Sequence, residues 1–196
     1  MKLKTALPSV IATIVFTVFA AGLPAQQTRT LFTGRTSVKL SSTFTTAATD
    51  LGVSVGRVFP TEMWDGWVIF PVTGGAIDLD TASGNILHSG GLTLKAGDTK
   101  VTLQSFIIDT TAKPVITGLV SVNGKLLGRI PLFDIALPAG FSLPLQLKQN
   151  RLVLKGVGLT LDAQAAGALD AVFHVNAFTA GFPVGTGQVV AYGAGW

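Results

Sequence analysis

Glycine and proline interrupt this sequence so often that long regular elements are excluded from most of it. The 196 residues include 23 glycines and nine prolines, and from Thr28 onward these separate short runs rich in Val, Ile, Leu, Phe and Thr. The runs recur at intervals of about 8–12 residues, a spacing typical of all-β sandwiches and barrels. We therefore expect a mainly β protein, an antiparallel β-sandwich or open barrel with one or two short helices.

Alternating apolar residues indicate that each strand buries one face. In the segment Gly91–Lys95, for example, Leu92 and Leu94 fall on the same side of the expected strand. Asn123-Gly124 predicts a type I′ hairpin, because both turn residues tolerate a positive φ. The expected strands are Thr28–Leu40, Val53–Phe59, Trp67–Val72, Ala76–Leu79, Asn85–His88, Leu92–Ala96, Lys100–Asp109, Val115–Val122, Lys125–Leu137, Arg151–Leu161 and Gly185–Tyr192.

Two segments depart from the strand pattern. Ser42–Leu51 and Asp162–Phe173 place apolar residues at helical spacing, and each follows an expected strand with a Ser or Asp available as N-cap. Aligning Leu40 with Leu161 superimposes the two strand–cap–helix units. They are either an internal repeat or a coincidence of a few matching residues.

The first 25 residues have the features of a secretory leader. Lys2 and Lys4 precede the apolar run Val10–Gly22, which is shorter than the roughly 20 residues that span a bilayer. We expect cleavage after Ala25; an uncleaved membrane-anchoring helix is the alternative. The expected protein is then secreted or extracytoplasmic, with residues 26–196 as a single domain and no transmembrane helix after the leader.

Composition excludes several functional classes. Charged residues make up only 12% of the chain, and without the two leader lysines twelve basic residues face ten acidic ones, so we expect no nucleic-acid partner. The absence of cysteine excludes disulfides, thiolate metal sites, a catalytic cysteine and a lipobox.

The motifs that could indicate catalysis or metal binding lie in unsuitable contexts. Gly52–Gly56 has the G-x-S-x-G pattern of a hydrolase nucleophile elbow, but a helical pattern precedes it and an extended one follows, the reverse of what the elbow requires. Asp78–Gly84 resembles half of a calcium loop, but Ser89 stands where the bidentate glutamate is needed, and the segment also fits an ordinary turn. We therefore expect neither an enzyme nor a metal site.

Three residues are the best candidates for contact with a ligand. His88 precedes two glycines between two expected strands, where its imidazole could reach a ligand or fill a structural role. Trp64 and Trp67 flank a turn and could form a stacking platform, or one could lie in the core and the other at the rim.

The segment His88-Ser89-Gly90-Gly91-Leu92 resembles the H-x-G-x-L signature of HtaA-type haem-binding domains, secreted or surface β-rich modules of Gram-positive haem uptake. Phe70–Gly75 resembles the family's strand ahead of that signature, and Gly156–Val190 resembles its last strands and alanine-rich helix. The resemblance implies haem as a candidate ligand and His88 as the matching site residue. The family's tyrosine has no counterpart in Ser41–Leu51, so the resemblance implies a divergent branch that requires no cofactor.

Three functions follow as hypotheses. The first is a secreted, non-catalytic HtaA-like module that binds haem or another planar or apolar small molecule. The second is a structural or adhesive cell-envelope module whose partner is an envelope protein. The third is a small outer-membrane barrel, but Val68–Phe70 and Phe106–Ile108 are apolar on both faces, as in a packed interior.

Overall fold

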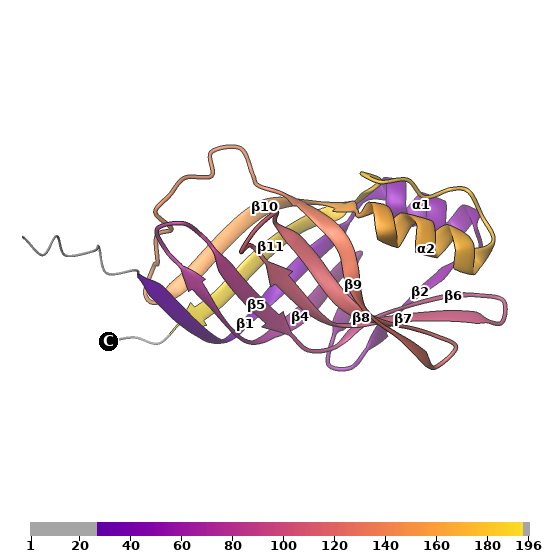
Figure 1. Cartoon of the computed structure of the whole chain (residues 1–196), viewed down its shortest axis with the longest axis horizontal. Helices are drawn as coiled ribbons and strands as arrows, with labels where there is room; N and C mark the ends of the chain where they lie inside the picture. The colour runs from indigo at the N-terminus through magenta and orange to yellow at the C-terminus, as the bar shows by residue number, and fades with distance from the viewer. Residues whose placement is uncertain (1–26, 194–196) are drawn as a thin grey trace, which may run out of the picture.

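One antiparallel sheet curves into a barrel in residues 27–193, the part of the chain that this computed structural model describes. Both helices lie at one end of the elongated barrel (Figure 1). The predicted leader, residues 1–25, lies outside the described residues. Neither helix in the described part of the chain is long and apolar enough to cross a membrane.

The elements alternate in the order expected for a β protein with two helical interruptions. Their bounds are β1 Thr28–Leu40, α1 Ser42–Asp50, β2 Ser54–Val58, β3 Glu62–Trp64, β4 Trp67–Asp78, β5 Gly84–His88, β6 Gly91–Ala96, β7 Thr99–Asp109, β8 Val115–Val122, β9 Lys125–Ala136, β10 Arg151–Leu161, α2 Ala163–Phe173 and β11 Pro183–Gly193.

Eight strands form the barrel wall. Their order is β7-β5-β4-β1-β11-β10-β9-β8, and pairing of β8 with β7 closes the ring. β6 and β2 extend the sheet beside the first half of β7, and β3 pairs with β4. The predicted mainly β fold is confirmed, and of the two predicted architectures the barrel is the correct one.

One prediction about the strands was wrong, and one strand was not predicted. The break expected after Val72 does not occur, because β4 continues through Gly74 and Gly75 with a shift of register against β5. At Gly75 a Cβ would lie 2.2 Å from the Asn85 carbonyl oxygen, so glycine there permits close strand pairing. The three-residue strand β3 was not predicted, since a segment this short carries no alternation signal.

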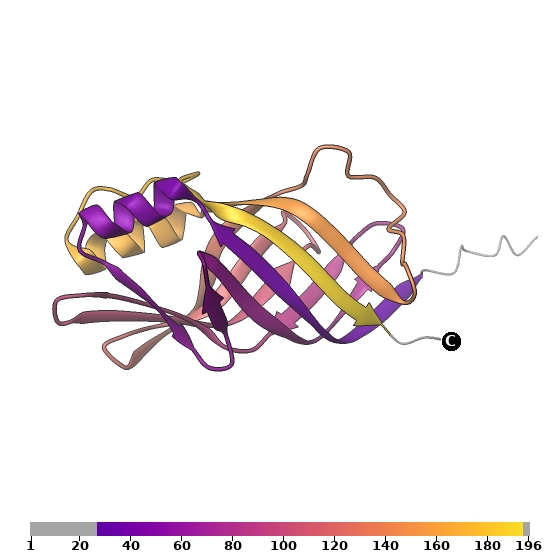
Figure 2. The ribbon, with the colours of Figure 1, turned by 180° about the vertical axis from the view of Figure 1, so that it is seen from behind.

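Both predicted helices are confirmed, together with their N-caps. Ser41 Oγ accepts a hydrogen bond from the Phe44 amide at 3.0 Å, and an Asp162 carboxylate oxygen accepts one from the Gln164 amide at 2.7 Å. The helices lie side by side over the same end of the barrel in both views (Figures 1 and 2). The two strand–cap–helix units therefore both end at the same end of the barrel.

The barrel interior is filled by one face of each strand. On β4, Val68, Phe70 and Val72 are buried and alternate with partly exposed residues. Phe70 meets Phe106 of β7 edge to face, with ring centroids 5.1 Å apart. The core is therefore continuous from β4 to β7, which are two strands apart in the barrel wall.

The β8–β9 hairpin gives the first testable prediction. Asn123 and Gly124 have φ values of 50° and 83°, as a type I′ turn requires. We expect Gly124→Ala to lower the free energy of unfolding by roughly 1 kcal/mol, because an L side chain is disfavoured at this φ. Gly167→Ala is the control: this helical glycine has open space around it, so the same change should raise stability by about 0.5–1 kcal/mol. Equal effects in urea titrations would contradict the turn assignment.

Candidate ligand-binding site

His88 lies inside the barrel and is only 6% exposed. Its Nε2 is 2.7 Å from the Thr36 hydroxyl, and its Nδ1 is 3.3 Å from the Phe106 carbonyl oxygen. Because a carbonyl can only accept, Nδ1 carries the proton, and Nε2 accepts the proton of the Thr36 hydroxyl. Both ring nitrogens of neutral His88 are therefore used within the protein.

Burial controls the protonation of this imidazole. Desolvation lowers the pKa of His88 from 6.5 to about 4, and hydrogen bonds to the Phe106 and Ile86 carbonyls oppose the shift only in part. His88 is therefore neutral at physiological pH.

The two glycines after His88 shape the sheet. A Cβ on Gly91 would lie 2.1 Å from the Leu103 carbonyl oxygen, and one on Gly90 would lie 2.3 Å from the Thr61 hydroxyl. The Gly91 amide donates to that hydroxyl at 2.7 Å. The glycines thus permit close packing against β7 and Thr61. The sequence had suggested that they allow a ligand to approach His88, and the structure does not use them in this way.

An apolar cavity lies beyond Thr36, toward the barrel end opposite the helices. This barrel cavity has a volume of about 280 Å³. Its walls come from all eight wall strands and from the adjoining connections. The lining side chains are Thr36, Ile77, Thr81, Ala82, Ile86, Ile108, Thr110, Ala112, Pro114, Ile116, Ile135, Leu137, Phe141, Leu143, Leu154, Val157, Leu159 and Val189, with Gly187.

The barrel cavity presents hydrocarbon to any molecule inside it. Its polar side chains are three threonines, and each hydroxyl already has an acceptor within the protein. Thr81 donates to Asp78 at 2.7 Å, Thr110 donates to the Ala82 carbonyl at 2.6 Å, and Thr36 donates to His88. No charged residue contributes to the lining. Such a cavity favours apolar ligands.

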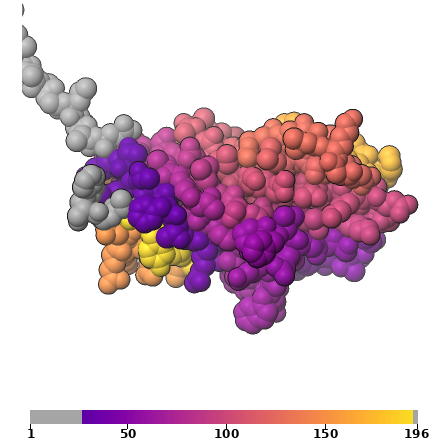
Figure 3. Space-filling model, turned by 90° about the horizontal axis from the view of Figure 1, so that it is seen from below, coloured from indigo at the N-terminus to yellow at the C-terminus, as the bar shows by residue number. Residues whose placement is uncertain are grey.

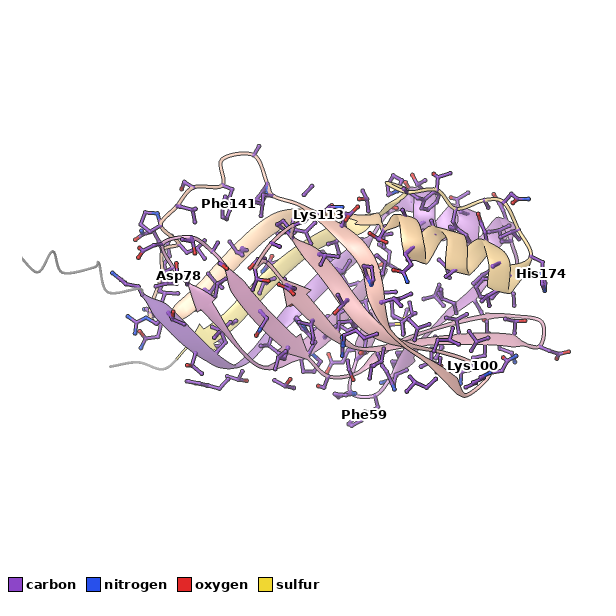
Figure 4. All side chains as sticks on the ribbon, in the orientation of Figure 1. Phe59, Asp78, Lys100, Lys113, Phe141 and His174 are labelled. Atoms are coloured by element: carbon purple, nitrogen blue, oxygen red, sulfur yellow. The ribbon has the colours of Figure 1, made fainter. Side chains whose placement is uncertain are left out.

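The segment of residues 137–150 covers one side of the barrel cavity. Phe141 and Leu143 from this segment line the cavity, and Leu143 is 47% exposed. Figure 4 places Phe141 and Asp78 at the same end of the barrel, away from the helices. The Leu145 amide donates to the Leu79 carbonyl and anchors the segment to the end of β4. The segment therefore forms an apolar lip at the cavity mouth.

Two smaller cavities continue along the barrel. A central cavity of about 50 Å³ lies on the other side of Thr36 and includes His88 in its lining. A helix-covered cavity of about 70 Å³ lies between the helices and the sheet, where Phe44 and Leu169 contribute to a wholly apolar lining. The Thr36–His88 pair is thus a buried polar contact between the barrel cavity and the central cavity.

The structure does not bring the three predicted site residues together. Trp64 and Trp67 pair across the β3–β4 turn on the outer surface, while His88 points inward. The segment between β2 and β4 projects from the body (Figure 3), and Trp64 is 75% exposed. The Lys39 ammonium lies 5.6 Å from the centre of the Trp67 ring and 3.8 Å from the Asp65 carboxylate. A ligand-binding role for the three residues remains a prediction.

Sequence reasoning missed the cavity lining and the partner of His88. Thr36 shares the inward side of β1 with Val38, so a threonine in an apolar row was the available signal. The contribution of residues 137–150 had no signal, because an irregular segment lacks periodicity.

The two local motifs behave as their contexts predicted. Ser54 begins strand β2 after α1, and its hydroxyl donates to the Lys95 carbonyl. Asp78 accepts hydrogen bonds from the amide and hydroxyl of Thr81, which is ordinary turn chemistry. Within residues 27–193, no group of three His, Cys, Asp or Glu side chains could hold a metal ion.

Comparison with solved structures identifies the architecture. The C-terminal domain of HtaA from Corynebacterium glutamicum matches with a TM-score of 0.66 and 12% identity, over 85% of this chain and 99% of that one. The HtaA N-terminal domain matches with a TM-score of 0.64 and 13% identity, over 85% and 100%. This chain has an HtaA-like fold. The haem-binding protein HtaB of the same organism matches with a TM-score of 0.57 and 11% identity, over 87% and 96%. No protein-family profile and no curated protein matches the sequence.

The three interior cavities do not fit a haem whose iron the protein ligates. Haem iron is held by His, Cys, Met or Tyr, and neither the barrel cavity nor the helix-covered cavity has any of these in its lining. His88 lines only the small central cavity, and both its nitrogens are occupied. His174 and Tyr192 are exposed. Iron ligation would require His88 to leave its partners.

The buried histidine gives a prediction about pH. Because its pKa is depressed in the folded state, the unfolded chain binds the additional proton first as pH falls. The contribution of neutral His88 to the free energy of unfolding is complete above about pH 6.5. It is lost as the pH falls toward 4, and the loss reaches up to about 3 kcal/mol. Urea titrations between pH 7 and 4 should show this loss in wild type and not in His88→Gln. His174→Gln removes an exposed imidazole and should keep the wild-type slope; an unchanged slope in His88→Gln would refute the assignment.

Proposed function

We propose that this protein is a non-catalytic binding module that holds an apolar small molecule in the barrel cavity. The observation that supports this most directly is a hydrocarbon-lined cavity of about 280 Å³ whose three hydroxyls are already bonded. Well-packed interiors rarely leave voids of this size. An open cavity at the barrel end therefore favours a ligand over a purely structural role.

The chemistry of the cavity restricts the ligand. A volume of about 280 Å³ lies near the lower end of the roughly 300–1,000 Å³ of small-molecule sites. A charged group inside would be desolvated without a partner. The expected ligand is thus a short hydrocarbon chain or ring system, with any polar end at the mouth beside Phe141 and Leu143.

Filling the cavity tests this function. Val189 points into the barrel cavity, and its neighbour Val190 lies on the outer surface of the same strand. Val189→Phe should weaken binding of 1-decanol, measured by displacement of Nile red, by at least about tenfold, because the ring replaces two or three methylenes of ligand. Val190→Phe should change the affinity less than about twofold. Equal affinity for all three proteins, or no binding by wild type, would reject the barrel cavity as the site.

Haem is the second candidate ligand, favoured by the likeness to the haem-binding protein HtaB. On the geometry of His88, we expect added haem to give a spectrum without a histidine-ligated Soret band, unchanged in His88→Ala. A sharp Soret band that disappears in His88→Ala, while His174→Ala retains it, would instead support haem.

The remaining proposals concern location and partners. We propose an extracytoplasmic location, supported by the leader-like residues 1–25. A structural or adhesive module that contacts an envelope protein would bind neither 1-decanol nor haem, so the two titrations also separate this alternative.

A further inference from the structure

The basic residues of this protein are unevenly placed. Strands β1, β11 and β10 are neighbours in the sheet and contain five basic residues and no acidic one. The sequence also has no acidic residue between Asp134 and Asp162. Figure 2 shows the three strands side by side on one face of the barrel. This face is therefore positively charged, although twelve basic and ten acidic residues nearly balance in the chain after the leader.

Three of these basic side chains surround one groove. Arg35, Arg151 and Lys155 line a hollow of about 410 Å³ on the outer surface, together with Gln188, Tyr192 and two valines. The strand register explains the convergence. Val190 lies between Arg35 on β1 and Val153 on β10, and Arg151 and Lys155 are two positions before and after Val153. Strand spacing places the Arg35 Cα about 12 Å from each of their Cα atoms, within reach of long side chains across one bound group.

None of the three basic side chains has an anionic partner in the described part of the chain. The ion pairs among residues 27–193 join Lys39 to Asp65 and Lys113 to Asp134. Among the strands beside β1, β4 separates Arg35 from Glu62, which lies on β3. The Nε of Arg151 is buried and has no hydrogen-bond acceptor. A buried donor without an acceptor and three like charges around one hollow both reduce stability, so these residues indicate a site for an anion.

We propose that this groove binds a phosphate ester, a site separate from the barrel cavity. Guanidinium groups match phosphate oxygens in a two-pronged geometry, and Lys155, Gln188 and Tyr192 add donors. The groove is larger than a phosphate group, and the valines on its floor can contact a small organic part. Glycerol phosphate has this chemistry, either free or as the headgroup of an anionic phospholipid.

Two charge-matched variants test the groove. The triple variant Arg35→Gln, Arg151→Gln and Lys155→Gln removes three positive charges from the groove. The control, Lys95→Gln, Lys100→Gln and Lys125→Gln, removes three exposed charges at hairpin tips; Figure 4 places Lys100 at the helical end of the molecule. Circular dichroism melts establish that both variants are folded. Glycerol 3-phosphate is titrated into each protein while backbone amide shifts are followed by NMR, and vesicles of phosphatidylglycerol or phosphatidylcholine are used in sedimentation assays.

In wild type, the amide shifts should be confined to β1, β10 and β11. The groove variant should lose at least about tenfold in affinity for glycerol 3-phosphate, and the control less than about twofold. Binding of phosphatidylglycerol but not phosphatidylcholine vesicles, lost in the groove variant, would identify the headgroup as the source; binding of glycerol 3-phosphate alone would identify a free ester. Equal losses in the two variants, or the absence of any shift or vesicle binding in wild type, would overturn the proposal.

Discussion

Hydrogen bonds between β7 and β8 join the two ends of the eight-stranded sheet, and the inward side chains can then pack only against one another. The fit around this closure is tight. A Cβ on Gly118 of β8 would lie 2.6 Å from Leu132 and 3.0 Å from Phe106. Closure also separates two chemical environments, because alternate residues of every wall strand face either the hydrocarbon interior or the outer surface.

A buried polar contact lies between two of the interior cavities. The Thr36 hydroxyl and His88 imidazole satisfy each other between the barrel cavity and the central cavity. With the Phe106 carbonyl as the second partner, the imidazole stays neutral and contributes no free donor to either cavity. An HtaA-like fold that uses its histidine in this way has an interior suited to hydrocarbon, and iron ligation would have to break these bonds.

The outer surface carries a basic groove that only the thickness of one strand separates from the apolar cavity. Val189 and Val190 are consecutive on β11, yet one lines the apolar cavity and the other the basic groove. A molecule with a hydrocarbon part and a phosphate part matches the two chemistries separately. The wall of the barrel lies between the cavity and the groove. We therefore expect each of them to bind its ligand independently of the other.

Local features of the sequence determined the elements, and tertiary structure determined the site. Spacing of apolar residues, the Asn123-Gly124 turn and the capping residues Ser41 and Asp162 specify strands, hairpin and helices, because each acts over a few neighbouring residues. The sequence did not distinguish a sandwich from a barrel. Closure of the sheet into a barrel depends on pairing between β7 and β8 and on the shear of the whole sheet. The partners of His88 and the three cations of the groove come from strands distant in sequence. Only the folded register places them together, because no local periodicity encodes which strands become neighbours.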